Sequence, residues 1–424
     1  MNPATPVSPH PTGSALAHHW ALDPAKIYLN HGSFGACPRA VLAAQDALRA
    51  RMEADAVAFF VEDFESLMDS SRAALANMLS CAPGCIAPIT NATWAVATVA
   101  DNLLWSGFLR AGDEILVPSH EYPACKNIMA QLASRTGARV VTVELPFPIT
   151  GPDEVFDRVL AAATDRTRLA LLSHVTSPTG LVLPIERLVP ALEGRGIRTL
   201  VDGAHGIGML PLNLGALRPS YYTSNCHKWL CAPKGAGFLF VREDLQTGFR
   251  PLALSNNANL PKPGRAQFLT EFEFCGTTDA TAFLVLPEAI RFVSSLVPGG
   301  WPEVMRHNRA LCLQGRAIVC EALNVAPPAP ESMIASIATI ILPPHHPHDE
   351  PRRKALSQRK SKYHDALQDA LLRTHRIQVP IWGLADKPDR FVRVSAQLYN
   401  TPEQYRELAR ALRTELDAEA RLPL

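Results

Sequence analysis

The chain has 424 residues, with 41 Lys and Arg against 40 Asp and Glu, so its formal net charge is +1. At about 150 residues per domain, this length predicts two or three domains. The nearly equal numbers of positive and negative charges argue against nucleic-acid or membrane-surface binding as the main activity. Charged residues are 19% of the chain and hydrophobic ones 47%, which predicts a sizeable core and excludes collagen, coiled-coil and disulfide-scaffold classes.

The first 25 residues lack the charged and apolar regions of a secretory signal, and we expect residues 1–25 to be a flexible arm. No run of about 18 apolar residues predicts a membrane span. The nine cysteines are odd in number and scattered, which favours reduced thiols over a disulfide framework. Together these features predict a cytoplasmic location.

Residues 26–290 alternate helical and strand-like segments, which predicts one large α/β domain. Helical periodicity covers residues 38–54, 64–79 and 94–108, and apolar β-branched runs cover residues 114–118, 139–145, 168–173, 198–202, 220–224 and 237–242. Near-continuous apolar strands between helices indicate a parallel sheet covered on both faces, whose strand ends bind ligands. Neither a dinucleotide-binding nor a P-loop glycine motif is present.

Residues 291–424 differ in pattern and predict a smaller C-terminal α+β domain. The expected elements are helices at 301–323, 363–373 and 402–418 and strands at 334–342 and 391–395. The polar stretch 343–362, with its three histidines and six Lys and Arg, is interpreted as a solvated insertion.

The densest polar signals surround Asp202 and Lys228. Asp202 ends an apolar strand, and Lys228 lies between His227 and Trp229 just before a Gly-rich turn. A desolvated lysine suits Schiff-base chemistry with pyridoxal phosphate, which also needs a carboxylate at its pyridine nitrogen. The residues alone leave a second interpretation open, in which Asp202 and Lys228 are a buried structural pair.

Eight segments in order resemble the class V aminotransferase-like family of fold-type I pyridoxal phosphate enzymes, and within it the isopenicillin N epimerase-like branch. They are YLNHGSFGACP (28–38), TNATWAV (90–96), HEYPA (120–124), SHVTSPTG (173–180), VDGAHG (201–206), NCHKWLCAPKGAGFL (225–239), CGTTD (275–279) and VRVSAQLYNT (392–401). The resemblance implies the fold of that family, with a mixed, mostly parallel seven-stranded sheet between helices.

The resemblance also implies catalytic and cofactor roles. Lys228 would hold pyridoxal 5'-phosphate as a Schiff base and move the Cα proton, Asp202 would pair with the pyridine nitrogen, and Tyr122 would stack on the ring. The remaining cofactor contacts implied are Ala92 and Thr93 at a helix start, Ser177, His205, Asn225 and His227. Many relatives carry Asn at the position of Ser177.

Substrate and partner roles follow from the same resemblance. Arg393 would bind the substrate carboxylate in a two-bond fork, with Asn30 and His31 beside the substrate. Gly276, Thr277 and Thr278 would complete the phosphate site of a neighbouring subunit, which implies a homodimer. No metal ligand set, nucleic acid or membrane is expected as a partner.

The reaction is ranked, because fold and cofactor do not determine it. Epimerisation or racemisation of an amino-acid-type substrate comes first, C–S lyase action on a sulfur-containing amino acid or its sulfoxide second, and transamination third. Residues 373–391 hold no cysteine, which argues against a persulfide-forming desulfurase. Two alternatives outside this class are a metal-dependent hydrolase using His174, Asp202, His205 and His227, and a non-enzymatic cofactor-binding regulator.

Overall fold

The computed structural model describes residues 13–344, 354–356, 358–363, 365–384 and 389–422, and its centre is a seven-stranded sheet. The strand order is β2-β8-β7-β6-β5-β3-β4, in which β8 pairs antiparallel with β2 and β7 and the other adjacent strands pair in parallel. The strands are β2 (Ile86–Ile89), β3 (Glu114–Pro118), β4 (Arg139–Val143), β5 (Thr167–Ser173), β6 (Arg198–Asp202), β7 (Tyr221–Asn225) and β8 (Gly237–Val241). The predicted mixed, mostly parallel sheet is confirmed.

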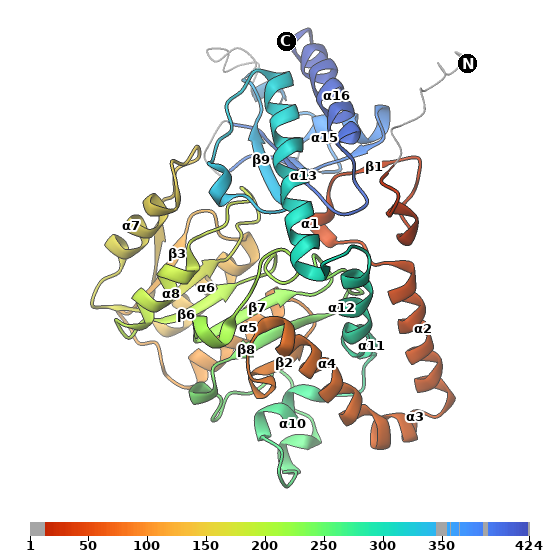
Figure 1. Ribbon diagram of the computed structural model, residues 1–424. Coiled ribbons are helices and arrows are strands. Elements are labelled where there is room, and N and C mark those ends of the chain that lie inside the picture. The colour runs from red at the N-terminus through yellow and green to blue at the C-terminus, as the bar shows by residue number, and fades with distance from the viewer. Residues whose placement is uncertain (1–12, 345–353, 357, 364, 385–388, 423–424) are drawn as a thin grey trace.

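Helices cover both faces of this sheet, as the apolar strands predicted (Figure 1). Along β5, Ala170 and Leu172 belong to one core cluster and Leu169 and Leu171 to another, because successive side chains point to opposite faces. The helices of this part are α1 (His31–Phe34), α2 (Arg39–Ala54), α3 (Ala56–Ala58), α4 (Phe64–Leu79), α5 (Ala92–Trp105), α6 (Pro123–Thr136), α7 (Pro152–Ala162), α8 (Ile185–Glu193), α9 (Leu214–Leu217), α10 (Gln267–Glu273), α11 (Thr281–Leu284) and α12 (Leu286–Ser295).

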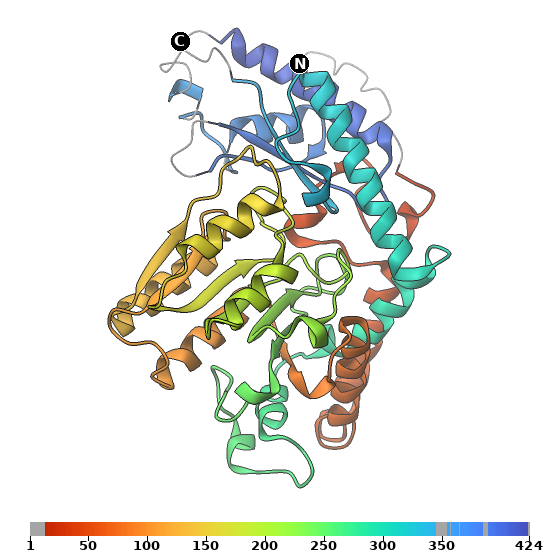
Figure 2. The same cartoon turned by 60° about the vertical axis from the view of Figure 1, so that its left-hand side comes forward.

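The C-terminal part lies beyond one end of the sheet, and the long helix α13 (Gly300–Leu323) connects the two parts (Figures 1 and 2). A three-stranded antiparallel sheet has the order β11-β12-β9. Its elements are β9 (Ile337–Ile341), α15 (Ala366–Thr374), β10 (Ile377–Gln378), β11 (Ile381–Trp382), β12 (Phe391–Ser395) and α16 (Pro402–Ala420). Most of the predicted insertion at 343–362 lies outside the described residues.

The N-terminal segment packs on the C-terminal part, so the described part of the expected arm is not free. Trp20 is 2% exposed and donates from its indole nitrogen to the carbonyl of Ala36, and the amide of Ser14 donates to the carbonyl of Tyr399. Strand β1 (Ile27–Tyr28) pairs in parallel with β10. This pairing joins the start of the expected large domain to the C-terminal part by backbone hydrogen bonds, and the boundary expected at residue 26 stays a prediction. The boundary at residue 290 stays a prediction.

All nine cysteines are unpaired in the structure, in agreement with the expectation of reduced thiols. Among the described residues, no helix has both the length and the apolar character that crossing a membrane requires. The fold therefore rests on the apolar core, without disulfide cross-links.

Candidate active site

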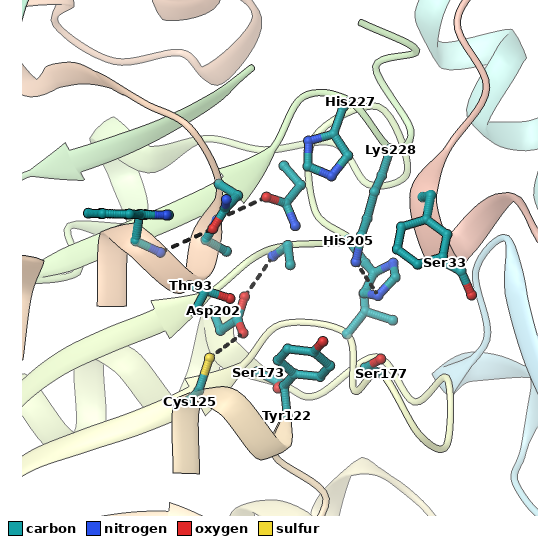
Figure 3. Close-up of a pocket in the computed structure, with 17 residues that line it drawn as sticks. Ser33, Thr93, Tyr122, Cys125, Ser173, Ser177, Asp202, His205, His227 and Lys228 are labelled. Atoms are coloured by element: carbon teal, nitrogen blue, oxygen red, sulfur yellow. Dashed lines mark hydrogen bonds between the residues drawn. The ribbon is translucent and has the colours of Figure 1, made fainter. Parts of the chain in front are cut away.

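A cavity of about 360 Å³ opens where the parallel strands end, the edge at which ligands bind in sheets of this kind. Figure 3 shows the side chains that line it, which come from chain segments nearly 200 residues apart. They are Ser33, Phe34, Asn91, Ala92, Thr93, Trp94, Tyr122, Cys125, Ser173, Val175, Ser177, Asp202, Ala204, His205, Asn225, His227 and Lys228. Apolar, aromatic and ionisable groups thus meet in one site.

The amine of Lys228 lies 3.1 Å from Nε2 of His205, and the two side chains point toward each other (Figure 3). The indole nitrogen of Trp229 donates to Nδ1 of His205 at 3.1 Å. An indole N–H can only donate, so Nδ1 accepts, and the neutral imidazole carries its proton on Nε2. The Nε2–H then donates to an unprotonated Lys228 amine.

Burial acts in the same direction on both side chains. It lowers the pKa of Lys228 from 10.5 to about 7, and the charge of Arg393 adds to the lowering. Burial, followed by the charge of Lys228, also holds the pKa of His205 well below its usual range. Near neutral pH the site therefore contains a neutral histidine and a lysine amine that loses its proton far more readily than a solvent-exposed lysine does.

Asp202 lies at the end of β6 with both carboxylate oxygens bonded. The amide of Ala204 donates to Oδ1 at 2.9 Å, and the thiol of Cys125 donates to Oδ2 at 3.2 Å (Figure 3). Each carboxylate oxygen has two lone pairs, so both can accept one further hydrogen bond. Asp202 is 4% exposed and borders the cavity, where its carboxylate can accept a hydrogen bond from a protonated ring nitrogen.

Another part of the cavity wall is the start of α5. The carboxamide oxygen of Asn91 accepts from the amide of Trp94, and that of Asn225 accepts from the amide of Ala92. No hydrogen bond from the Thr93 hydroxyl to a described residue is present, and Nδ1 of His227 is buried without a partner. A helix start with such open donors binds anions such as phosphate.

Arg393 on β12 lies behind the cavity wall at 2% exposure. Its NH1 donates to the carbonyl of Ser177 at 2.6 Å, and its NH2 donates to the hydroxyl of Ser33 at 3.0 Å. The guanidinium stacks 4.6 Å from the ring centre of Trp382, and its Nε is buried without a partner. Among the described residues, no carboxylate pairs with Arg393, and its hydrogen bonds go to two serines, so its charge is suited to an incoming carboxylate.

The match to known proteins covers almost the whole chain. Residues 27–408 match the family described as aminotransferase class-V. The chain belongs to this family. Its cofactor is therefore pyridoxal 5'-phosphate, and it is an enzyme, which confirms the expectation from the eight motifs.

Two curated relatives in the family carry different activities in their names. Isopenicillin N epimerase of Amycolatopsis lactamdurans is 35% identical over 403 residues, which cover 93% of this chain and 96% of the epimerase. A probable chloroplastic L-cysteine desulfhydrase of Arabidopsis thaliana is 29% identical and covers 94% of this chain and 84% of its own. The relatives of this chain thus share a family and differ in the reaction that their names give.

Solved structures of the same fold confirm the architecture. The cystine C–S lyase C-DES superposes with a TM-score of 0.72 at 24% identity, over 91% of this chain and 97% of the lyase. The Escherichia coli cysteine desulfurase CsdA has a TM-score of 0.71 at 19% identity, over 95% and 98% of the two chains.

Most residues carried over from the class V motifs line the cavity. The ones that do not are Asn30 and His31, the segment Gly276, Thr277 and Thr278, and Arg393. His31 is fully buried: its Nε2 donates to the carbonyl of Lys228 at 2.9 Å, and its Nδ1 accepts from the hydroxyl of Tyr399 at 2.8 Å. The side chain of Asn30 accepts from Ser33. Both therefore lie behind the wall rather than in it. Their expected contact with substrate stays a prediction.

Gly276, Thr277 and Thr278 lie outside this cavity, and both threonines are exposed. Their expected role at the phosphate site of a neighbouring subunit stays a prediction. Tyr122, which is also carried over from the motifs, borders the cavity, and 43% of its surface is exposed, so its ring is accessible for stacking.

Sequence reasoning missed several lining residues that stand next to motif residues. Ser33 and Phe34 lie in the first class V segment and Trp94 in the second, while Cys125 follows HEYPA by one residue. Spacing offered a signal for Cys125, since position i+3 on a helix returns to the face of Tyr122 at the start of α6.

The histidines expected as ligands of the alternative metal-dependent hydrolase do not meet at one point. His174 bonds to Tyr222 and Glu186, and His205 bonds to Trp229 and Lys228, so these histidines do not converge. Among the described residues, the single group of three potential ligand side chains within reach of one another is Glu121, Cys125 and Asp202. That group contains no histidine.

Proposed function

We propose that this class V enzyme catalyses epimerisation at Cα of an amino-acid-type substrate, with C–S β-elimination as the second candidate. The observation that carries the proposal is the buried Lys228 amine, whose pKa is lowered to about 7 and which lies 3.1 Å from His205 within the same cavity as Asp202. A relative named isopenicillin N epimerase at 35% identity supports the first candidate. Relatives named L-cysteine desulfhydrase support the second.

The residues of the cavity fit pyridoxal phosphate at each of its polar ends. The open donors at the start of α5 and the unpartnered His227 Nδ1 fit the phosphate, and Asp202 fits the pyridine nitrogen. Lys228 would hold the cofactor through its amine, and Tyr122 would cover the ring. When bound, the cofactor withdraws electrons from Cα and so makes the bonds at that carbon easier to break.

Lys228 then performs the proton chemistry in this proposal. Its amine, whose pKa is lowered to about 7, could both remove and return a proton at Cα at neutral pH. Arg393 would orient the substrate through its carboxylate, which fixes the bond that faces Lys228. Ser33 and Ser177, which hold the guanidinium, border the cavity and would be displaced or join the contact.

The candidate reactions differ in what the site must supply. Epimerisation requires a second proton donor on the face opposite Lys228, and the hydroxyl of Tyr122 is the acidic group that the cavity offers there in our proposal. Elimination requires only Lys228 and a leaving group at Cβ. Transamination, the third candidate, requires the site to accept two substrates in turn.

We also propose that the enzyme is a cytoplasmic homodimer. The phosphate end of each cavity would then be reached from the other subunit by Gly276, Thr277 and Thr278. Trp94, which borders the cavity, is 54% exposed, so this side is accessible to a second subunit. One related protein is named chloroplastic, so location varies among relatives. Sedimentation of the purified protein tests the dimer.

The function is tested by loading the protein with pyridoxal phosphate and supplying an amino-acid panel in deuterated water. Cα deuteration with loss of chirality identifies an epimerase or racemase, pyruvate release a lyase, and keto-acid dependence an aminotransferase. Lys228→Ala should abolish the visible absorption of the bound cofactor and all turnover. A wild-type protein that gains no visible band would overturn the proposal.

A further inference from the structure

Glu121 is a buried carboxyl group that none of the roles above uses. It lies between β3 and α6, directly before Tyr122, and is 2% exposed. Its Oε1 accepts from the hydroxyl of Ser173 at 2.6 Å and from the amide of Tyr122 at 2.7 Å. Glu121 is thus tied both to the end of β5 and to the residue expected to stack on the cofactor ring.

Glu121 also lies close to a second carboxylate, that of Asp202. Oε2 is buried and has no hydrogen-bond partner, while a Glu121 oxygen, the Cys125 sulfur and an Asp202 oxygen all lie within 4.8 Å of one another. Ser173 and Asp202 occupy paired positions on the adjacent strands β5 and β6, so the backbone register holds this arrangement. A buried oxygen without a donor is costly, and carrying a proton itself lowers that cost.

The titratable groups around Glu121 cannot all be charged. Burial, and then the charge of Asp202, raises the pKa of Glu121 to about 8. Burial together with Asp202 and Glu121 raises the pKa of the Cys125 thiol far above its usual value, so Cys125 stays a neutral donor. Lys228, which faces the same cluster, is the nearby cation. Glu121, beside the carboxylate of Asp202, therefore keeps its proton near neutral pH.

We propose that Glu121 is a positioning residue that acts through Asp202: it holds one proton behind Asp202, so that the cluster presents a single negative charge to the cofactor. As pH rises Glu121 releases this proton, and the second negative charge favours the protonated pyridine ring. The inference rests on the proposed cofactor contacts of Asp202 and Lys228. By linkage, cofactor binding must change the proton affinity of Glu121 to the same extent.

The test compares the holoenzyme with Glu121→Gln, which keeps the shape of the neutral acid and cannot ionise. The visible absorption of the bound cofactor is titrated from pH 6 to 10, and the dissociation constant of pyridoxal phosphate is measured at pH 7 and pH 9. Glu271→Gln is the matched control, because Glu271 is an equally buried carboxyl group that pairs with Arg250 away from the cavity.

The wild-type titration should contain a one-proton step that Glu121→Gln lacks and Glu271→Gln keeps. The pH 9 to pH 7 ratio of dissociation constants should differ between wild type and Glu121→Gln by about fivefold or more. If Glu121→Gln does not load, Ser173→Ala decides: loss of its hydrogen bond to Oε1 should move the step to higher pH.

Superimposable titrations of wild type and Glu121→Gln, or an unmoved step in Ser173→Ala, would overturn the inference while the proposed function stands. A wild-type protein without a visible band would instead overturn the proposed function. The two failures are therefore distinguishable in one set of spectra.

Discussion

Replacing Arg393 by lysine separates the shape of the carboxylate contact from its charge. The guanidinium presents NH1 and NH2 toward Ser177 and Ser33, two residues of the cavity wall, and rests on the ring of Trp382. Lysine keeps the positive charge and loses the planar two-bond fork and the stacking. The charge that helps to lower the pKa of Lys228 also remains, so cofactor capture should not change.

The expected loss follows from one charge-assisted hydrogen bond. Such a bond contributes about 1.5–3 kcal/mol, which corresponds to about a 10- to 150-fold fall in kcat/KM. Because the fork would hold the substrate before and during the reaction, most of the loss should appear as a higher KM. Arg393→Ala should lose more, since it leaves the substrate carboxylate without a cation.

The assay measures kcat and KM of Arg393→Lys with the substrate found in the amino-acid panel, beside the visible band of the bound cofactor. Arg390→Lys is the control, because Arg390 precedes the same strand and bonds to Asp365 and Glu419 outside the cavity. It should leave KM unchanged. An unchanged KM in Arg393→Lys and Arg393→Ala would refute the assignment, and loss of the band would show that Arg393 serves the cofactor instead.

Three further predictions concern the wall around Lys228. The rate at which apoenzyme captures pyridoxal phosphate should fall about tenfold per pH unit below pH 7 and level off above pH 7. The reason is that the lowered pKa of Lys228 leaves its amine free above pH 7. A rate that still rises tenfold between pH 8 and 9 would contradict this. Trp229→Phe removes the donor that keeps the His205 proton on Nε2, and should slow capture up to about tenfold without unfolding the chain; equal rates would argue against the tautomer. Gly35→Ala should lower the unfolding free energy by more than about 2 kcal/mol, because Gly35 has a φ of +68° and an added Cβ would lie 1.9 Å from the carbonyl oxygen of His227; a melting temperature equal to that of wild type would disprove the clash.

Much of the large domain could be predicted because its signals are local. The strands at 114–118 and 198–202 coincide with β3 and β6, since short apolar β-branched runs on a doubly covered sheet need no partner to be recognised. Helix α5 begins at Ala92 rather than at Trp94, because the side chain of Asn91 caps the amide of Trp94. The periodicity missed this helix start because a capping side chain, and not apolar spacing, determines it.

The site was predictable as a set of residue types and less so as a set of contacts. The class V motifs placed Lys228, Asp202 and Tyr122 at one cavity, where the structure also has them. They could not show that His31 bonds to the backbone of Lys228 from behind. A motif reports which residue occurs at a position, and the direction of its side chain depends on packing.

By itself the sequence determined the fold class, the family and the cofactor, because apolar periodicity and ordered motifs are properties of the chain. Tertiary structure alone decided that Arg393 meets Ser33, 360 residues away, through docking of the C-terminal part on the first strand. It also decided which nitrogen of His205 accepts from Trp229 and that Glu121 is buried beside Asp202. These depend on burial and on donor directions, which exist only once distant segments exclude water together.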